Sequence, residues 1–116
     1  MSAGIHNIYV EQGATYSRSF TWKISGNPVN LTGYSARLQV RRDRSTDPMI
    51  YLTSAAGGGI TLNGATGRID VLISATGTAS LFAGRHRYDL ELEDGSGFVT
   101  RLLKGTFIVS SEETIN

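Results

Sequence analysis

An acidic row, Asp89, Glu91 and Glu93, alternates with apolar residues toward the C-terminal end of the chain. Residues two apart on a strand are about 6.6–7 Å apart, and paired carboxylates can hydrolyse glycosides when they flank a cleft at about 5–10 Å. The spacing therefore permits glycosidase chemistry. Three arginines of the same stretch can neutralise the row: Arg85, Arg87 and Arg101. A solvated, salt-paired surface is the simpler interpretation, because exposed pairs of this kind occur widely.

Two histidines, His6 and His86, are further candidates for acid–base or metal chemistry. Both lie on the apolar side of expected strands, and neither has an Asp or Glu at ligand spacing, so we expect structural roles. The chain contains no cysteine, and the sequence pattern of a zinc site is missing. The segments around Asp94 and around Asp43 and Asp47 lack the acid density of a calcium loop. We therefore expect no catalytic residue, no metal and no cofactor.

Length and charge balance narrow the classes of partner. We expect the 116 residues to form a single domain over residues 1–116. The net charge of +1 is too small to favour nucleic acid or an anionic membrane. No apolar run approaches the roughly 20 residues that span a bilayer, and the first residues lack the pattern of a signal peptide. We expect a protein that is made in a cytosol and has neither nucleic acid nor a membrane as partner.

Alternating apolar and polar residues predict short strands along most of the chain. In residues 15–24 the apolar side holds Phe20 and Trp22, and in residues 34–42 it holds Leu38 and Val40. Turn residues recur about every ten positions, and many glycines suit turns between short strands. These patterns predict an all-β fold of seven to nine strands, an antiparallel β-sandwich or flattened barrel. At most one short helix is expected, at residues 74–82.

The longest alternation, over residues 85–109, predicts a hairpin of two strands joined by a glycine-rich turn. A three-residue loop places Leu90 opposite Leu102 and Glu91 opposite Arg101, which satisfies both faces of the hairpin. The residues that this register turns inward are Tyr88, Leu90, Leu92, Phe98 and Leu102.

Lys104 falls on the inward side in this register, which is unfavourable for a charged side chain. A bulge at Lys104-Gly105 would shift the alternation and bring Phe107 and Val109 into the core. Three apolar residues of the last strand then remain on its outer side: Val99, Leu103 and Ile108.

A strand needs only one apolar face to contribute to the core. Apolar side chains on its other face therefore suggest a surface that binds a partner. Leu72 is a further outward apolar residue on its own strand, and arginines cluster in an exposed loop that could dock on an acidic surface. The candidate interaction surface is therefore Leu72, Val99, Leu103, Ile108, Arg41, Arg42 and Arg44. The alternative is that the register is wrong and the apolar members belong to the core.

Several segments, in their order along the chain, resemble a known group of proteins. They are QGATY (12–16), FTW (20–22), NLTGYSARLQVR (30–41), GRI (67–69), ISAT (73–76), YDLEL (88–92) and RLLKG (101–105). Together they resemble small β-sandwich virion proteins of tailed bacteriophages. They are similar also to the immunoglobulin-like N-terminal domains of siphophage baseplate proteins that hold receptor-binding proteins.

The resemblance implies an immunoglobulin-like sandwich that is a non-enzymatic structural or assembly part of a phage particle, in the tail, baseplate, neck or head. It implies other virion proteins as partners in a symmetric ring or shell, and a place in the virion after synthesis in the host bacterial cytoplasm. The alternative is a carbohydrate-binding or host-adhesion module, since sandwich folds also serve lectins. Sugar binding is not favoured, because the only tryptophan, Trp22, lies on a core position.

Overall fold

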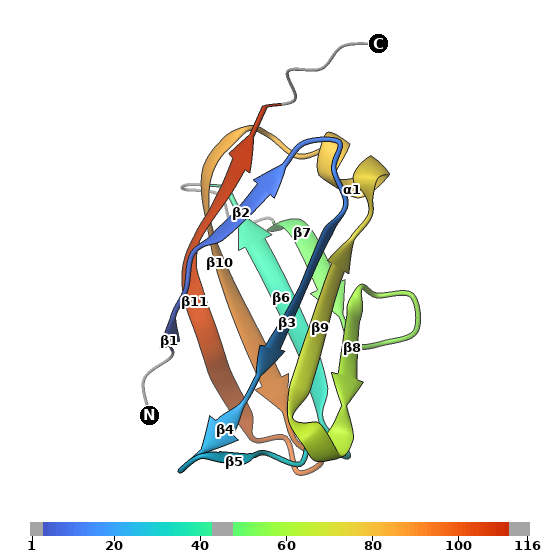
Figure 1. Ribbon diagram of the computed structural model, residues 1–116, viewed down its shortest axis with the longest axis vertical. Coiled ribbons are helices and arrows are strands. Elements are labelled where there is room, and N and C mark those ends of the chain that lie inside the picture. Colours follow the sequence, from blue (N-terminus) through green and yellow to red (C-terminus); the bar gives the residue numbers. More distant parts are fainter. Residues whose placement is uncertain (1–3, 43–47, 112–116) are drawn as a thin grey trace.

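Two β-sheets face each other and enclose the core (Figure 1). The structure is a computed structural model that describes residues 4–42 and 48–111. The larger sheet has six strands in the order β1-β11-β10-β6-β7, with β2 also paired to β11. Its strands are β1 (Gly4–Ile5), β2 (Ile8–Glu11), β6 (Ser35–Arg41), β7 (Pro48–Thr53), β10 (Gly84–Glu93) and β11 (Val99–Ser110).

The smaller sheet has three strands in the order β3-β9-β8. A two-stranded ribbon, β4 with β5, continues from β3 at one end of the sandwich (Figure 1). The elements outside the larger sheet are β3 (Tyr16–Thr21), β4 (Lys23–Ile24), β5 (Asn27–Pro28), β8 (Ile60–Asn63), the 3₁₀ helix η1 (Gly64–Thr66), β9 (Arg68–Ile73) and α1 (Ala75–Ala79). The two sheets do not join into a closed barrel, so the fold is a sandwich.

The short helix α1 closes one end of the sandwich, within the range predicted for it (Figure 1). Ser74 caps it, because its hydroxyl accepts a hydrogen bond from the Gly77 amide at 3.0 Å. Thr78 is fully buried and donates from Oγ1 to the Ala14 carbonyl at 2.8 Å, which ties the helix to the turn before β3. Gly77 and the brevity of the apolar pattern keep the helix to five residues.

The core forms where the apolar sides of both sheets meet, as the alternation predicted. Leu38 and Val40 of β6, Leu90 of β10 and Ile69 of β9 are almost completely buried. Trp22 is 8% exposed, and its ring meets Tyr34 edge-on with ring centres 5.9 Å apart. The described residues form eleven strands, more than the seven to nine predicted, because β1, β4 and β5 are paired segments of only two residues.

The β10–β11 hairpin has the predicted register at its loop but a bulge in a different place. Glu91 lies opposite Arg101 as predicted, whereas Leu90 lies opposite Leu103, so the extra residue is Leu102. The predicted bulge at Lys104-Gly105 is wrong. A bulge at Leu102 turns Leu103 toward the core side with Leu90 and leaves Lys104 exposed on the solvent side, where its charge is hydrated.

Phe98 is 69% exposed, so its predicted place in the core is wrong. It closes the hairpin loop instead of starting the strand: its amide donates to Asp94 Oδ1 at 2.9 Å, and its carbonyl accepts from the Asp94 amide at 3.0 Å. The hydrogen bond from the Phe98 amide, followed by those from Ser96, lowers the pKa of Asp94.

The N-terminal segment forms two short strands, β1 and β2, which both pair in parallel with β11 and are separated at His6 and Asn7. Gly105 of β11 lies against this break. A Cβ at Gly105 would overlap the His6 carbonyl oxygen and lie 2.9 Å from its carbon. The Tyr88 hydroxyl donates a hydrogen bond to the same oxygen at 2.6 Å. The backbone between β1 and β2 is therefore also fixed from the core side.

Candidate interaction face

We define the outer face as the charged and polar side chains on the solvent side of β6, β10 and β11. Strand β10 lies between the other two, and its residues alternate between core and solvent, so every second side chain shares this face. The members are Arg37, Gln39, Arg41, Arg85, Arg87, Asp89, Glu91, Glu93, Arg101 and Lys104. Six cations minus three carboxylates give the outer face a net charge of +3, against +1 for the whole chain.

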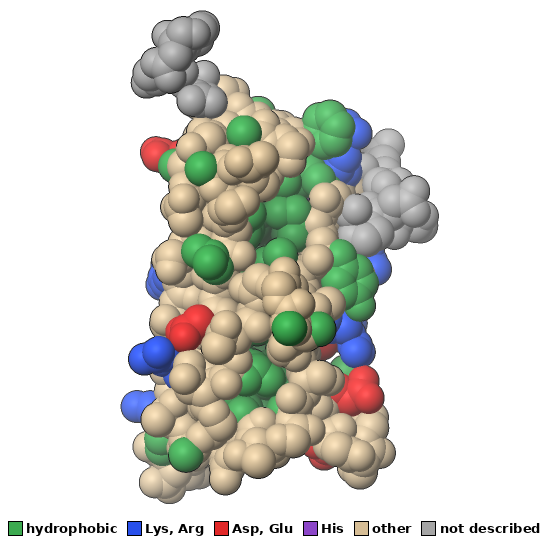
Figure 2. Space-filling view, turned by 90° about the vertical axis from the view of Figure 1, so that its right-hand side faces the viewer, with side chains coloured by type: hydrophobic (Ala, Val, Ile, Leu, Met, Phe, Trp, Pro, Cys, Tyr) green, Lys and Arg blue, Asp and Glu red, His purple; other side chains and the backbone are tan. Residues whose placement is uncertain are grey.

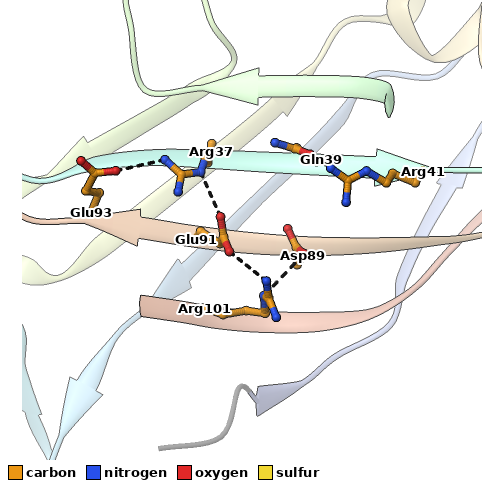
Figure 3. Close-up of polar contacts among 7 residues, drawn as sticks. All are labelled: Arg37, Gln39, Arg41, Asp89, Glu91, Glu93 and Arg101. Carbon is orange, nitrogen blue, oxygen red and sulfur yellow. Dashed lines mark hydrogen bonds and ion pairs between the residues drawn. The ribbon is translucent and has the colours of Figure 1, made fainter. Parts of the chain in front are cut away.

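An ion-pair network crosses three strands of the outer face, with Glu91 at its centre (Figure 3). Arg37 Nε lies 2.9 Å from Glu91 Oε1, and Arg101 Nη2 lies 3.1 Å from Glu91 Oε2. Arg37 Nη1 also reaches Glu93 at 3.2 Å, and Arg101 Nε reaches Asp89 at 3.5 Å. Each carboxylate of the acidic row therefore has an arginine partner, as predicted for a salt-paired surface. Of the three arginines predicted to neutralise the row only Arg101 does so, and Arg37 of β6 takes the place of Arg85 and Arg87.

The network fixes the charge states of its members. Burial acts to raise the pKa of Glu91, but hydrogen bonds and charges from Arg37 and Arg101 outweigh it and hold that pKa below its usual value. The hydrogen bond to Glu91, followed by that to Glu93, raises the pKa of Arg37. A glycosidase general acid needs a carboxyl group whose pKa is raised, so Glu91 is suited to holding the strands together rather than to proton transfer.

Next to this network the outer face is hollowed into a basic depression of about 520 Å³. Arg87 and Arg41 lie directly opposite each other on β10 and β6 at one side of it. Lys104 lines it from β11. Its lining also includes Ile5, Gln39, Asp89 and Arg101.

The apolar members of the predicted interaction surface are not brought together. Leu72 is 53% exposed on β9 of the smaller sheet, whereas Val99 is exposed at the start of β11 in the larger sheet. Ile108 is half-buried on the solvent side, between Arg85 of β10 and Tyr9 of β2. Leu103 packs against the core, so its predicted outward position is wrong; the bulge at Leu102 is the reason.

The predicted arginines also separate. Arg41 lies on the outer face, where its guanidinium donates to the side-chain oxygen of Gln39 (Figure 3). Arg42 turns elsewhere, with its guanidinium carbon 4.1 Å from the ring centre of the exposed Phe82. Arg44 lies outside the described residues, as do Asp43 and Asp47.

Other exposed apolar residues border the outer face and were not predicted. Ile5 on β1 is 80% exposed, Tyr9 on β2 is 66% exposed, and Tyr51 on β7 lies opposite Gln39. A signal for Tyr9 existed in the sequence, because it alternates with the buried Ile8 and Val10. The outer face thus combines a charged centre with an apolar border.

A second surface feature, the edge groove, lies between the two sheets on the side that Figure 2 faces. It has a volume of about 860 Å³, and apolar side chains are visible within it (Figure 2). Strands β7 and β8, which line it, are the end strands of their sheets among the described residues. Its lining includes Met49, Leu52, Ile60 and Leu62.

The histidines occupy packed positions. His86 is buried, with Nε2 2.7 Å from the Phe82 carbonyl oxygen, and His6 meets Phe20 edge-on at 5.4 Å between ring centres. Among residues 4–42 and 48–111, no group of three His, Asp or Glu side chains is placed to hold a metal ion. Within the same ranges, no helix has the length and apolar character needed to cross a membrane.

Comparison with known proteins identifies the fold class. No model of a known protein family matches the chain, and no curated protein matches it significantly. The N-terminal domain of phage TP901-1 ORF48 is 12% identical with a TM-score of 0.55, over 95% of this chain and 99% of that one.

The extracellular domain of the voltage-gated sodium channel beta4 subunit is 14% identical with a TM-score of 0.51, over 97% of this chain and 96% of that one. It is described as a parallel homodimer with a role in cell–cell adhesion. These similarities establish an immunoglobulin-like β-sandwich. At such low identity the phage domain is a distant structural neighbour.

Proposed function

We propose that this protein is a non-enzymatic structural or assembly component of a tailed-bacteriophage particle. The observation that carries the proposal is the correspondence with the phage TP901-1 domain, which extends over 95% of this chain and 99% of that domain. The sequence segments that resemble phage β-sandwich proteins support the same class. The proposal covers the tail, baseplate, neck and head alike.

A binding role rather than catalysis is supported by the outer face. Its carboxylates are paired with Arg37 and Arg101, and the lowered pKa of Glu91 opposes a role as general acid. The exposed apolar side chains of Ile5 and Tyr9 beside it support a contact with another protein, because exposed apolar residues next to polar ones are a feature of interaction surfaces.

The proposed partners are other virion proteins arranged in a symmetric ring or shell. Closed symmetry repeats one contact many times, and linked contacts raise overall affinity without a tight individual contact. A single sandwich with one modest docking face can therefore be held in such an assembly.

A carbohydrate-binding or host-adhesion module is the second candidate, supported by the exposed rings of Tyr9, Tyr51 and Phe98 and by the adhesion-type neighbour. Burial of Trp22 counts against it, because sugars stack on exposed aromatic rings. A glycan array separates the two candidates. Selective binding of one glycan class that is lost in Tyr9→Ala or Tyr51→Ala would favour adhesion.

Quantitative mass spectrometry of gradient-purified particles tests the proposal. The protein should be present at a fixed ratio to the main structural proteins. A protein that is abundant in the infected-cell lysate but missing from mature particles would refute the virion assignment.

A further inference from the structure

Four cations line the basic depression, and among the described residues three of them, Arg41, Arg87 and Lys104, form no ion pair, whereas Arg101 does. Asp89 lies opposite Lys104, but its carboxylate pairs with Arg101, which is itself shared with Glu91. Arg41 donates to the neutral side chain of Gln39, and no carboxylate among residues 4–42 and 48–111 forms an ion pair with it. Among the described residues, neither Arg87 nor Lys104 forms an ion pair.

The placement of Arg41 directly opposite Arg87 adds to this imbalance. Like charges at directly opposite positions of neighbouring strands destabilise a sheet. Asp89, the nearest carboxylate on β10, pairs with Arg101, and Glu91 and Glu93 lie further along the strand with arginine partners of their own. A bound anion between Arg41, Arg87 and Lys104 would relieve the repulsion.

We infer that the basic depression binds carboxylate side chains of an extended, acidic segment of a partner protein. Arginine and lysine donate charge-assisted hydrogen bonds to carboxylates. Gln39 and Asp89 in the same lining offer oxygen acceptors for backbone N–H groups, and Ile5 offers an exposed apolar contact at the border. The volume of about 520 Å³ accommodates a few side chains, as in other ligand sites of this size.

The charge of the outer face selects among possible occupants. A second copy of this chain would bring one face of net charge +3 against another, which repels. A nucleic acid would bring its phosphates close to Asp89, Glu91 and Glu93 as well as to the cations, which weakens the gain. A protein segment can place carboxylates at the cations and neutral or donor groups at the acidic row.

An acidic segment specifies the chemistry of the partner that the proposed function requires. Only the identity of that partner as a virion protein rests on the proposed function. The test of acidic-segment binding uses the purified protein alone. A negative result in the binding test therefore does not change the mass-spectrometric result on particles. Absence of the protein from particles likewise does not change the result of the binding test.

Fluorescence anisotropy with a labelled peptide of alternating leucine and glutamate provides the test. The comparison probes are the same peptide with glutamine in place of glutamate, and a single-stranded thymidine oligonucleotide. The site variant is Arg87→Gln with Lys104→Gln. The matched control is Lys23→Gln with Arg68→Gln, which removes the same charge from exposed positions outside the outer face.

The expected result is salt-sensitive binding of the glutamate peptide, weakened about tenfold or more in the site variant and unchanged in the control. The urea midpoint of Arg87→Gln should equal or exceed that of the wild type, because the substitution relieves like-charge repulsion. Equal losses in both double variants, no binding of the glutamate peptide, or tighter binding of the oligonucleotide would each overturn the inference. A lowered urea midpoint would also overturn it, since Arg87 would then serve the fold.

Discussion

Replacement of Gly105 by alanine tests how the N-terminal strands are held on the sandwich. Gly105 lies in β11 opposite Tyr88, and its φ lies outside the left-handed region, so its backbone conformation suits alanine. The obstacle is space. An added Cβ would overlap the His6 carbonyl oxygen, and this oxygen also accepts the hydrogen bond from the Tyr88 hydroxyl.

The expected cost follows from what must move. Inserting a methyl group into a tightly packed site typically costs about 1–3 kcal/mol. Displacement of His6 would also break two hydrogen bonds, from Tyr88 Oη to His6 O at 2.6 Å and from the His6 amide to Lys104 O at 3.0 Å. Each contributes about 1 kcal/mol. With partial relaxation, we expect Gly105→Ala to lower the free energy of unfolding by about 2–4 kcal/mol.

Urea unfolding followed by tryptophan fluorescence measures this change, because Trp22 is the only tryptophan and is buried. Gly95→Ala is the matched control. Its φ also lies outside the left-handed region, and the nearest atom to its added Cβ is 4.0 Å away. If Gly105→Ala stays within about 0.5 kcal/mol of the wild type, as a surface substitution would, the close approach of His6 to Gly105 is refuted.

Three further predictions concern the core, the ion-pair network and the docking border. Trp22→Ala should lower the free energy of unfolding by about 3–5 kcal/mol in urea denaturation, and a loss below about 1 kcal/mol would place the ring at the surface. Glu91 has a lowered pKa in the folded protein, so its stabilisation is present above the unfolded value near 4.5 and is lost as pH falls through the folded value. Glu91→Gln should therefore destabilise by roughly 1 kcal/mol at pH 7, and this difference should vanish in unfolding titrations at acidic pH; a constant difference would contradict the pairing. Tyr51→Glu should leave the isolated fold intact and reduce incorporation into particles, whereas Leu103→Glu should unfold the domain in circular dichroism melts; the reverse pattern would show that the bulge at Leu102 is misplaced.

The sandwich and most of its core follow from local alternation in the sequence. Leu38, Val40 and Leu90 each lie between polar neighbours, and a period of two puts such residues on one face of a strand. A core position was predicted for Trp22 on the same basis, and its side chain is buried. The helix was predictable from its capping serine and small apolar residues.

The bulge position could not be read from the hairpin alone. Placing the extra residue at Leu102 or at Lys104-Gly105 brings Phe107 into the core in either case, so the alternation of apolar residues does not separate the two. The exposed position of Lys104 favours Leu102, and the fit to a third segment fixes the choice, because Gly105 must lie beside His6 without a side chain. That constraint comes from residues about a hundred positions away along the chain.

The outer face was predictable only in part for the same reason. Glu91 with Arg101 follows from the hairpin loop, and this pair forms. Arg37 joins it only because β6 lies beside β10, a pairing between residues far apart in sequence. The same pairing sets Arg41 against Arg87, and no local pattern signals that juxtaposition. The sequence therefore identified the charged residues of the outer face but not the depression that some of them line.

A structure of the purified particle by cryo-electron microscopy tests the central proposal most directly. We predict that every copy of the sandwich sits with its outer face, centred on Arg87 and Lys104, against an acidic surface of a neighbouring virion protein in a symmetric ring or shell. Particles that lack the sandwich, or in which the outer face is open to solvent in every copy while another surface makes the contacts, would contradict the proposed mode of docking.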